Sequence, residues 1–398
     1  MTYRHARHTG VILAAVTVLL VTACEVSEPE PVRNPYPVQD PLPEVGTAGM
    51  QLPTSFEELR VVDPGWDTTH QYADGVYLAA GERDSVLEFT AVDVHGDVLW
   101  AAQRPASCSG FAVTTDAQGR ALAILGDIQT TDEALAATTA TAYDLTTGEQ
   151  VWAPVEVPGP HQGPGLVFAA SPEGFMGDSG PRTALDPTTG RVVATESSSD
   201  EIRLVGEYHG IVLLTEDDAL VARDTTDDGE LWRIPLAEHG LTAASIGPSP
   251  STPSGDGLAL IATSDSTSAL IDLQEGAILS QTARDAAVDP TTGTLVILDD
   301  TGLHAYDTDD QPLWSLTVAP ETTIAALGSV FLYLREDGTV RVHNVLTGDV
   351  AQAYEPHGQG PIIVPAQITA NGAAVLLDGD RRLLAAVPEH PGLGDSGP

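Results

Sequence analysis

A ten-residue stretch that recurs along the chain places the strongest constraint on its fold. It runs YDLTTGEQVW from Tyr143 to Trp152 and combines a strand end, a tight turn and a new strand with a large aromatic residue. Aspartate can hydrogen-bond the backbone two residues on, and glycine supplies the positive φ that a short hairpin needs. The stretch therefore predicts a β-hairpin that carries a tryptophan for packing.

Weaker copies of this stretch occur before and after it. The turn residues of the seven copies are Asp93, Asp144, Asp186, Asp224, Asp272, Asp307 and Asn344. The turn glycines are Gly148, Gly190, Gly276 and Gly348, and the tryptophans are Trp100, Trp152, Trp232 and Trp314. Tryptophan is replaced at Ala194, Ser280 and Gln352, and no glycine ends the turn after Asp307. Because the same residue types recur from one copy to the next, we expect them to close hairpins and pack sheets rather than to bind a ligand.

The spacing of the copies predicts an all-β protein. They lie 35 to 51 residues apart, about 42 on average, a period that suits a four-stranded propeller blade. We expect an eight-bladed β-propeller of antiparallel sheets, with seven blades as the alternative. An eighth unit near residues 373–387 lacks its last strand, which the run 56–62 could supply. Pairing of the N- and C-terminal strands would then close the ring and remove two exposed edges.

The N-terminus has the features of an export signal. Arg4 and Arg7 precede an apolar run over residues 11–23, long enough for a signal peptide and short for a membrane-spanning helix. The run ends in LVTAC at Cys24, which resembles a bacterial lipobox, whose cysteine is acylated and becomes the new N-terminus. We therefore expect a lipoprotein signal peptide over residues 1–23 and a protein anchored through Cys24 to the extracytoplasmic face of the cell membrane.

Composition divides the rest of the chain. Residues 24–54 are rich in proline, which favours an extended tether of at most ~90 Å. The propeller is expected over residues 55–388 and a flexible C-terminal tail over residues 389–398. Cys24 and Cys108 are the only cysteines, so lipidation of Cys24 excludes an intramolecular disulfide.

The charge of the chain restricts its partners. The net charge is −40, and all 17 basic residues are arginine. Nucleic acid is disfavoured, because phosphate binding requires a positive patch. An arginine-only, acidic composition is typical of a GC-rich or salt-adapted genome, and we expect an actinobacterial source.

The alanine, aspartate, threonine-glycine and tryptophan of the copies resemble the repeat of the PQQ-like (quinoprotein-type) β-propellers, over about residues 55–388. Enzymes of that family bind pyrroloquinoline quinone and calcium and commonly carry adjacent cysteines, which this chain lacks. We therefore expect no cofactor, no metal and no catalytic residue. The family also includes non-enzymatic lipoproteins that act as scaffolds in envelope assembly, so the resemblance implies a binding protein whose partner is an envelope protein.

Two alternatives remain. Loops that lead to the innermost strands carry Cys108, His161, His239 and His357. Thiolate and imidazole donors suit zinc or copper, so the protein could be a surface receptor for a small ligand or metal at the channel mouth. The simpler interpretation is that these residues are dispersed around a wide ring. A quinone-dependent dehydrogenase is the second and less favoured alternative.

Overall fold

A computed structural model describes residues 31–389 except residue 84 and segments 108–109, 132–133, 171–179, 200–201, 250–252, 254–256 and 265–266. The chain divides into Met1–Glu30 and Pro31–Pro398, and every feature below belongs to the second unit. The signal peptide, Cys24, Cys108 and residues 390–398 lie outside the described residues. Predictions about them stay predictions.

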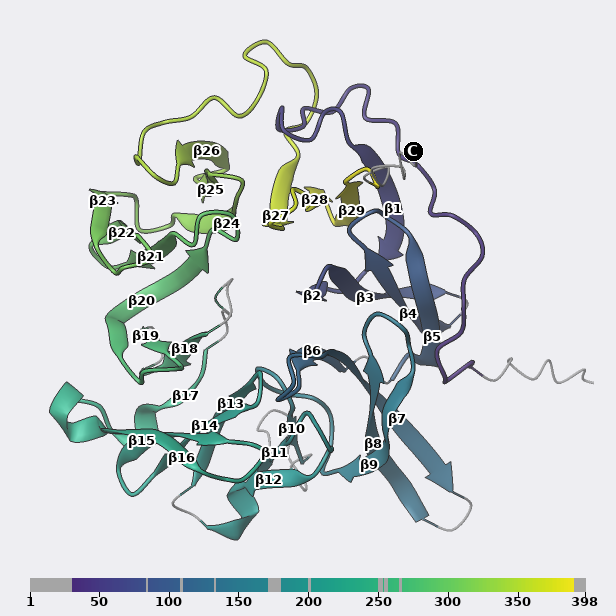
Figure 1. Cartoon of the computed structure of the whole chain (residues 1–398), viewed down its shortest axis with the longest axis vertical. Helices are drawn as coiled ribbons and strands as arrows, with labels where there is room; N and C mark the ends of the chain where they lie inside the picture. The colour runs from purple at the N-terminus through teal and green to yellow at the C-terminus, as the bar shows by residue number, and fades with distance from the viewer. Residues whose placement is uncertain are drawn as a thin grey trace, which may run out of the picture. The chain divides into compact units, whose positions relative to one another are not determined.

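The described residues confirm the all-β prediction. They form 29 strands and three short 3-10 helices, η1 (Glu196–Ser198), η2 (Leu236–His239) and η3 (Ala243–Ser245). None of the helices formed by these residues has the length and apolar character needed to cross a membrane. The strands pair antiparallel, and short turns join most of them (Figure 1). The frequent glycine and aspartate residues between the apolar runs predict these turns.

Four sheets of the described part have four strands each. The first contains β2 (Gln71–Ala73), β3 (Val76–Arg83), β4 (Val86–Asp93) and β5 (Val98–Pro105). The second contains β6 (Phe111–Thr115), β7 (Ala121–Thr131), β8 (Ala134–Asp144) and β9 (Gln150–Val157). The third contains β13 (Arg203–Tyr208), β14 (Ile211–Glu216), β15 (Ala219–Asp224) and β16 (Glu230–Pro235). The fourth contains β27 (Val364–Ile368), β28 (Ala374–Asp378), β29 (Arg381–Ala386) and β1 (Arg60–Trp66).

Two further sheets have three strands, and an isolated bridge extends each. One contains β10 (Val167–Ala169), β11 (Arg182–Leu185) and β12 (Val192–Thr195). The other contains β24 (Thr323–Gly328), β25 (Phe331–Glu336) and β26 (Thr339–Asn344). His161 forms an antiparallel bridge with Phe168 of β10, and Val350 forms one with His343 of β26. Each bridge places an additional short extended segment at the edge of its sheet.

The remaining sheet has seven strands, two groups of which share the long strand β20. Its strands are β17 (Gly247–Pro248), β18 (Leu258–Ala262), β19 (Ser268–Asp272), β20 (Ile278–Val288), β21 (Leu295–Asp299), β22 (Gly302–Tyr306) and β23 (Pro312–Leu316). Ala283 pairs with Ser268 of β19 and with Asp299 of β21, and the register shifts beside it. The first half of β20 thus ends one group of strands, and the second half begins the next.

The first and last strands of the described residues pair in the β27–β28–β29–β1 sheet. β1 pairs with β29 in antiparallel register, with Arg60 opposite Ala386 and Val62 opposite Leu384. The strand begins at Arg60, four residues after the start of the predicted run 56–62. The N-terminal strand therefore supplies the strand that the last repeat lacks.

The segment before β1 lies on the edges of two sheets. Tyr36 exchanges backbone hydrogen bonds of 2.8 and 2.9 Å with Ala101 of β5. The amide of Val45 donates to the carbonyl of Val61 of β1 at 2.9 Å. The described part of the predicted proline-rich tether, residues 24–54, thus runs along the outer strands β5 and β1.

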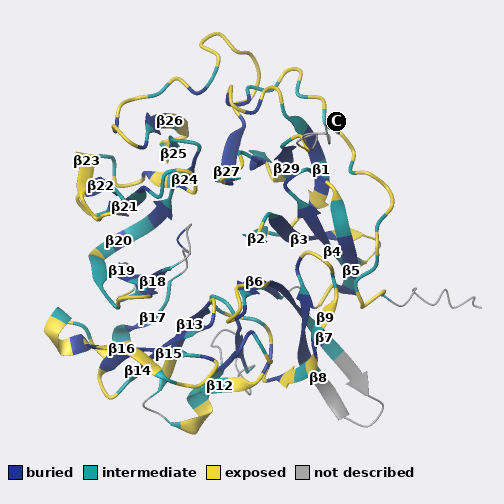
Figure 2. Cartoon of the chain, in the orientation of Figure 1, coloured by how far each residue is buried: buried dark blue, intermediate teal, exposed yellow. Residues whose placement is uncertain are grey.

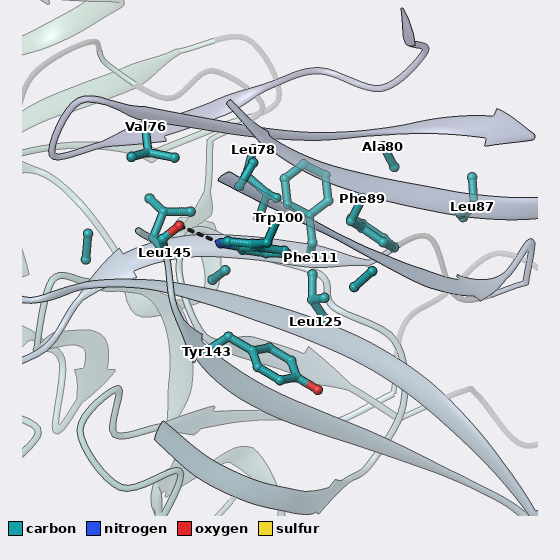
Figure 3. Packing of buried hydrophobic residues seen from close by; sticks show 14 residues of the cluster. Val76, Leu78, Ala80, Leu87, Phe89, Trp100, Phe111, Leu125, Tyr143 and Leu145 are labelled. Atoms are coloured by element: carbon teal, nitrogen blue, oxygen red, sulfur yellow. Dashed lines mark hydrogen bonds between the residues drawn. The ribbon is translucent and has the colours of Figure 1, made fainter. Parts of the chain in front are cut away.

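Neighbouring sheets contact one another through their first strands. β2 lies beside β6, β13 beside β17, and β24 beside both β20 and β27. Buried residues follow the strands, whereas exposed residues gather on turns and connecting segments (Figure 2). Between the β2–β5 and β6–β9 sheets, Phe89, Phe111, Leu125 and Tyr143 pack around Trp100 (Figure 3). This packing fixes the positions of the turns described next.

Candidate functional site

The repeated aspartate closes each hairpin through its own carboxylate. Oδ1 of Asp144 accepts hydrogen bonds from the amides of Thr146 at 3.0 Å and Thr147 at 2.8 Å. Gly148 follows with φ +70°. Equivalent bonds of 2.7–3.1 Å close the turns at Asp93, Asp186, Asp224, Asp272, Asp307 and Asn344. One side-chain oxygen of each residue is thus engaged by backbone amides and holds its turn closed.

The repeated tryptophan joins one sheet to the turn of the next. The indole of Trp100 donates to the carbonyl of Leu145 at 2.8 Å, and its ring lies on Gly148 (Figure 3). The same relation links Trp152 to Pro187 and Gly190, Trp232 to Leu273 and Gly276, and Trp314 to Val345 and Gly348, with hydrogen bonds of 2.6–3.0 Å. A buried indole needs a partner for its N–H, and the turn carbonyl supplies it.

The departures from the repeat have a physical reason. Where Ala194 or Ser280 replaces tryptophan, the left-handed position of the next turn holds Asp228 (φ 62°) or Asp310 (φ 57°) instead of glycine. Each of the four repeated tryptophans, in contrast, faces a turn that presents the bare α-carbon of a glycine. After Ala194, the guanidinium of Arg191 donates to the carbonyl of Thr225 at 3.1 Å in place of an indole.

Sequence reasoning missed two turns of the same type. Asp116 and Asp289 accept hydrogen bonds from backbone amides two residues on, at 2.9 and 2.7 Å. Asp116 lies in the turn between β6 and β7, and Asp289 lies in the turn between β20 and β21. These two turns connect different strands from those connected by the seven predicted turns. The sequence does carry a pattern that predicts the second of these turns, because residues 289–293 read DPTTG, as residues 186–190 do.

The three described histidines of the predicted ligand loops have separate surroundings. His161 is partly buried, forms a bridge with Phe168 and bonds the carbonyl of Gly165 through Nε2 at 2.6 Å, and desolvation lowers its pKa. His239 ends η2, and His357 is exposed in the connection before β27. Cys108 lies outside the described residues. In the part of the chain that the structure describes, no three His, Cys, Asp or Glu residues are grouped to hold a metal ion.

A buried carboxyl group lies where three sheets meet. Glu207 of β13 accepts hydrogen bonds from the amides of Gly210 at 2.7 Å and Leu166 at 3.0 Å. The hydroxyl of Thr114, on β6, lies 3.4 Å from Oε2. Burial is the main cause that raises the pKa of Glu207 to about 7, and the nearby carboxylate of Asp186 adds to it. No sequence pattern distinguishes this residue among 57 acidic side chains.

Large apolar side chains are exposed on outer strands of the described sheets. Leu231 is 48% exposed on β16, Leu313 is 39% exposed on β23, and Val350 is 81% exposed. Leu231 and Leu313 each precede one of the repeated tryptophans. These side chains offer apolar area on an edge that also presents backbone groups, a combination suited to protein contacts.

The repeats of this chain have counterparts in a known protein family. Residues 136–386 match the PQQ_2 family, described as outer membrane protein assembly factor BamB. None of the curated proteins matches the chain.

Several solved structures are similar at low identity. The β-propeller domain of Cps50 (Swd1) from Myceliophteria thermophila is 10% identical, with 82% of this chain and 98% of that chain covered and a TM-score of 0.41. The Pan2 WD40 domain from Neurospora crassa is 10% identical, with coverage of 83% and 94% and a TM-score of 0.39.

Proposed function

The chain belongs to the PQQ_2 family of the outer membrane protein assembly factor BamB, and from this membership we propose that it is a non-catalytic protein-interaction scaffold of the cell envelope. The observation that carries the proposal is the match over residues 136–386, which spans most of the described sheets. Rigid sheets that present loops and edges are suited to recognition.

The proposed architecture is a ring of eight four-stranded blades. Division of the seven-stranded sheet within β20 gives two groups of four strands that share it. The extended segments at His161 and Val350 supply fourth strands to the two three-stranded sheets. The pairing of β1 with β29 supports closure, because it joins the first and last parts of the described chain.

The proposed location is the extracytoplasmic face of the cell membrane, with Cys24 lipidated, in an actinobacterial host. Six residues stand between Cys24 and Pro31 in the sequence. A lipid on Cys24 would anchor the chain to the membrane through its N-terminal segment.

The proposed contact surface consists of two outer edges, that of β16 with Leu231 and that of β23 with Leu313. A photoreactive amino acid placed at either position should cross-link the same envelope protein in intact cells, identified by mass spectrometry. Thr339, which is polar and exposed, is the matched control position. Cross-links that are absent, or equally frequent from position 339, would rule out this surface.

Anchoring is tested separately. Metabolic labelling with palmitate should mark the wild-type chain, and Cys24→Ser should remove the label and release the protein from the membrane fraction. A labelled Cys24→Ser variant would contradict lipidation at this residue.

A further inference from the structure

The β27–β28–β29–β1 sheet has an arginine where four other sheets have tryptophan. Each repeated tryptophan pairs across the strands with an alanine, as Trp100 does with Ala91 and Trp232 does with Ala222. Arg60 pairs in the same way with Ala386. Arg60 is therefore the residue of β1 that corresponds to the tryptophans.

Arg60 also makes the contacts of a tryptophan with the next turn. Its Nη2 donates to the carbonyl of His95 at 2.6 Å. A methyl group added to Gly96, whose φ is +81°, would lie 3.1 Å from the same nitrogen. The guanidinium thus takes over the hydrogen bond of the missing indole. The same methyl group would also lie 3.1 Å from Cβ of Ala386 and 3.3 Å from Cγ2 of Val62, so the turn packs directly on the last sheet.

A hollow of about 440 Å³ lies beside Arg60. Its lining is Glu58, Arg60, His95, Asp97, Ala386, Val387, Pro388 and Glu389. The volume is within the range of roughly 300–1,000 Å³ typical of ligand pockets. The hollow lies beside the contact between Arg60 and the turn at Gly96. In the described part of the chain, this is the one contact between neighbouring sheets in which a glycine of the repeated turns faces a non-aromatic residue.

The lining defines what the hollow can bind. Ala386, Val387 and Pro388 supply apolar contact, and the guanidinium of Arg60 can stack on the face of an aromatic ring. Glu58, Asp97 and Glu389 give it an excess of negative charge, since Arg60 is its only arginine or lysine and lies 3.9 Å from Asp97. An aromatic group next to a positive charge matches both properties.

We propose that this hollow binds a tryptophan side chain of a partner protein, next to an arginine or lysine of the same partner. At the four internal interfaces an indole lies on the strand opposite an alanine equivalent to Ala386, which makes tryptophan the aromatic side chain suited to this position. The three carboxylates account for the basic neighbour. The proposal rests on the scaffold function, for which it names a recognition site and the chemistry of the partner.

Binding is tested with peptides and the purified full chain. The probe is acetyl-Gly-Trp-Arg-Gly-amide, observed by ligand-detected NMR titration, with Trp→Ala and Arg→Glu peptides as controls. We expect saturable binding of the probe and at least tenfold weaker binding of each control peptide. Absence of saturable binding to the wild-type chain would overturn the proposal.

A substitution in the chain itself provides the sharper test. Arg60→Trp should place an indole in the hollow, raise the midpoint of urea unfolding and weaken probe binding at least tenfold. Gln352→Trp is the matched control, because Gln352 is exposed and no turn of the repeat follows it before β27. Unchanged binding in Arg60→Trp would overturn the proposal.

A second variant is used if Arg60→Trp does not fold. Glu58→Lys should weaken binding of the basic probe at least fivefold and strengthen binding of the Arg→Glu peptide. No change in either affinity would overturn the proposal.

Two further outcomes are informative. One separates binding of a partner in the hollow from binding of the chain's own tail there. The other separates the hollow from the edges at Leu231 and Leu313 as the docking surface. If binding appears only after deletion of residues 390–398, the chain's own tail occupies the hollow, and the partner proposal is wrong. Cross-linking at Leu231 and Leu313 measures the scaffold function at another surface. Specific cross-links together with no probe binding would therefore reject the hollow as a docking site and leave the scaffold function standing.

Discussion

The indole of Trp100 lies directly on the α-carbon of Gly148, so that a methyl group added there would be 3.0 Å from Cγ of the ring. The tryptophan belongs to one sheet and the glycine to the turn of the next. The absence of a Cβ atom on the glycine leaves space for the indole ring. The relation recurs at Gly190, Gly276 and Gly348. It accounts for the glycine at the turn that follows each of the four repeated tryptophans.

A glycine substitution measures this contact. Gly148→Ala should lower the free energy of unfolding by about 2–4 kcal/mol, since it adds both a positive-φ penalty and a collision with Trp100. Gly75→Ala is the matched control, because Gly75 has φ +79° and nothing within 4 Å of an added Cβ. It should cost about 1 kcal/mol, measured by urea unfolding. Equal losses for the two variants would show that the indole contact has no energetic role.

The turn aspartates are predicted to act through one oxygen. Asp144→Ala should lower the free energy of unfolding by about 1 kcal/mol, because two backbone amides lose their acceptor. Asp144→Asn should stay within about 0.5 kcal/mol of wild type, since the side-chain oxygen of Asn344 accepts from Leu346 and Thr347 at 3.0 and 3.1 Å. Urea denaturation curves distinguish the two variants. A comparable loss for both would assign the effect to the negative charge.

The stability of the protein should depend on Glu207. Its folded pKa of about 7 lies above the ordinary value of 4.5, so the folded state holds the proton more tightly than the unfolded state does. The stabilisation that protonation provides is complete below about pH 4.5 and is lost as pH rises through 7, an effect on the order of 3 kcal/mol.

Glu207→Gln tests this dependence. The difference in unfolding free energy between the variant and wild type should move in favour of the variant between pH 5 and pH 8. The groups that act on Glu207 are the carboxylate of Asp186, the amides of Leu166 and Gly210, and the hydroxyl of Thr114. A pH-independent difference would show that Glu207 is ionised in both states throughout this range.

The N-terminal segment is predicted to protect the edge of β5. Tyr36→Pro removes the amide that donates to the carbonyl of Ala101 at 2.8 Å. Hydrogen exchange of β5 should accelerate at least tenfold, measured by mass spectrometry. Tyr36→Phe keeps the backbone bonds and loses the hydroxyl contacts with Glu88 and Gln103, so it should change exchange little. Unchanged exchange in Tyr36→Pro would mean that residues 32–36 do not protect this edge.

The turns and their tryptophans could be predicted from sequence because each is determined within a few residues. The link between Ser280 and Asp310 could not, since it joins separate copies and appears only when sheets are placed side by side. Residues 31–45 bind edges through backbone groups, which leave no side-chain pattern in a proline-rich stretch. The burial of Glu207 depends on three sheets, and local sequence carries no sign of it.

The long-range closure of the last sheet has a consequence for how the chain matures. Asp63 and Arg381 form an ion pair at 2.6 Å although 318 residues separate them. Among the described strands β29 is the last to be synthesised, so β1 cannot pair with it until all the strands between them have been made. Such distant pairing is slow, and the unpaired strand is prone to aggregation while it waits. Completion of β29 thus sets the earliest moment at which the fold can become fully cooperative.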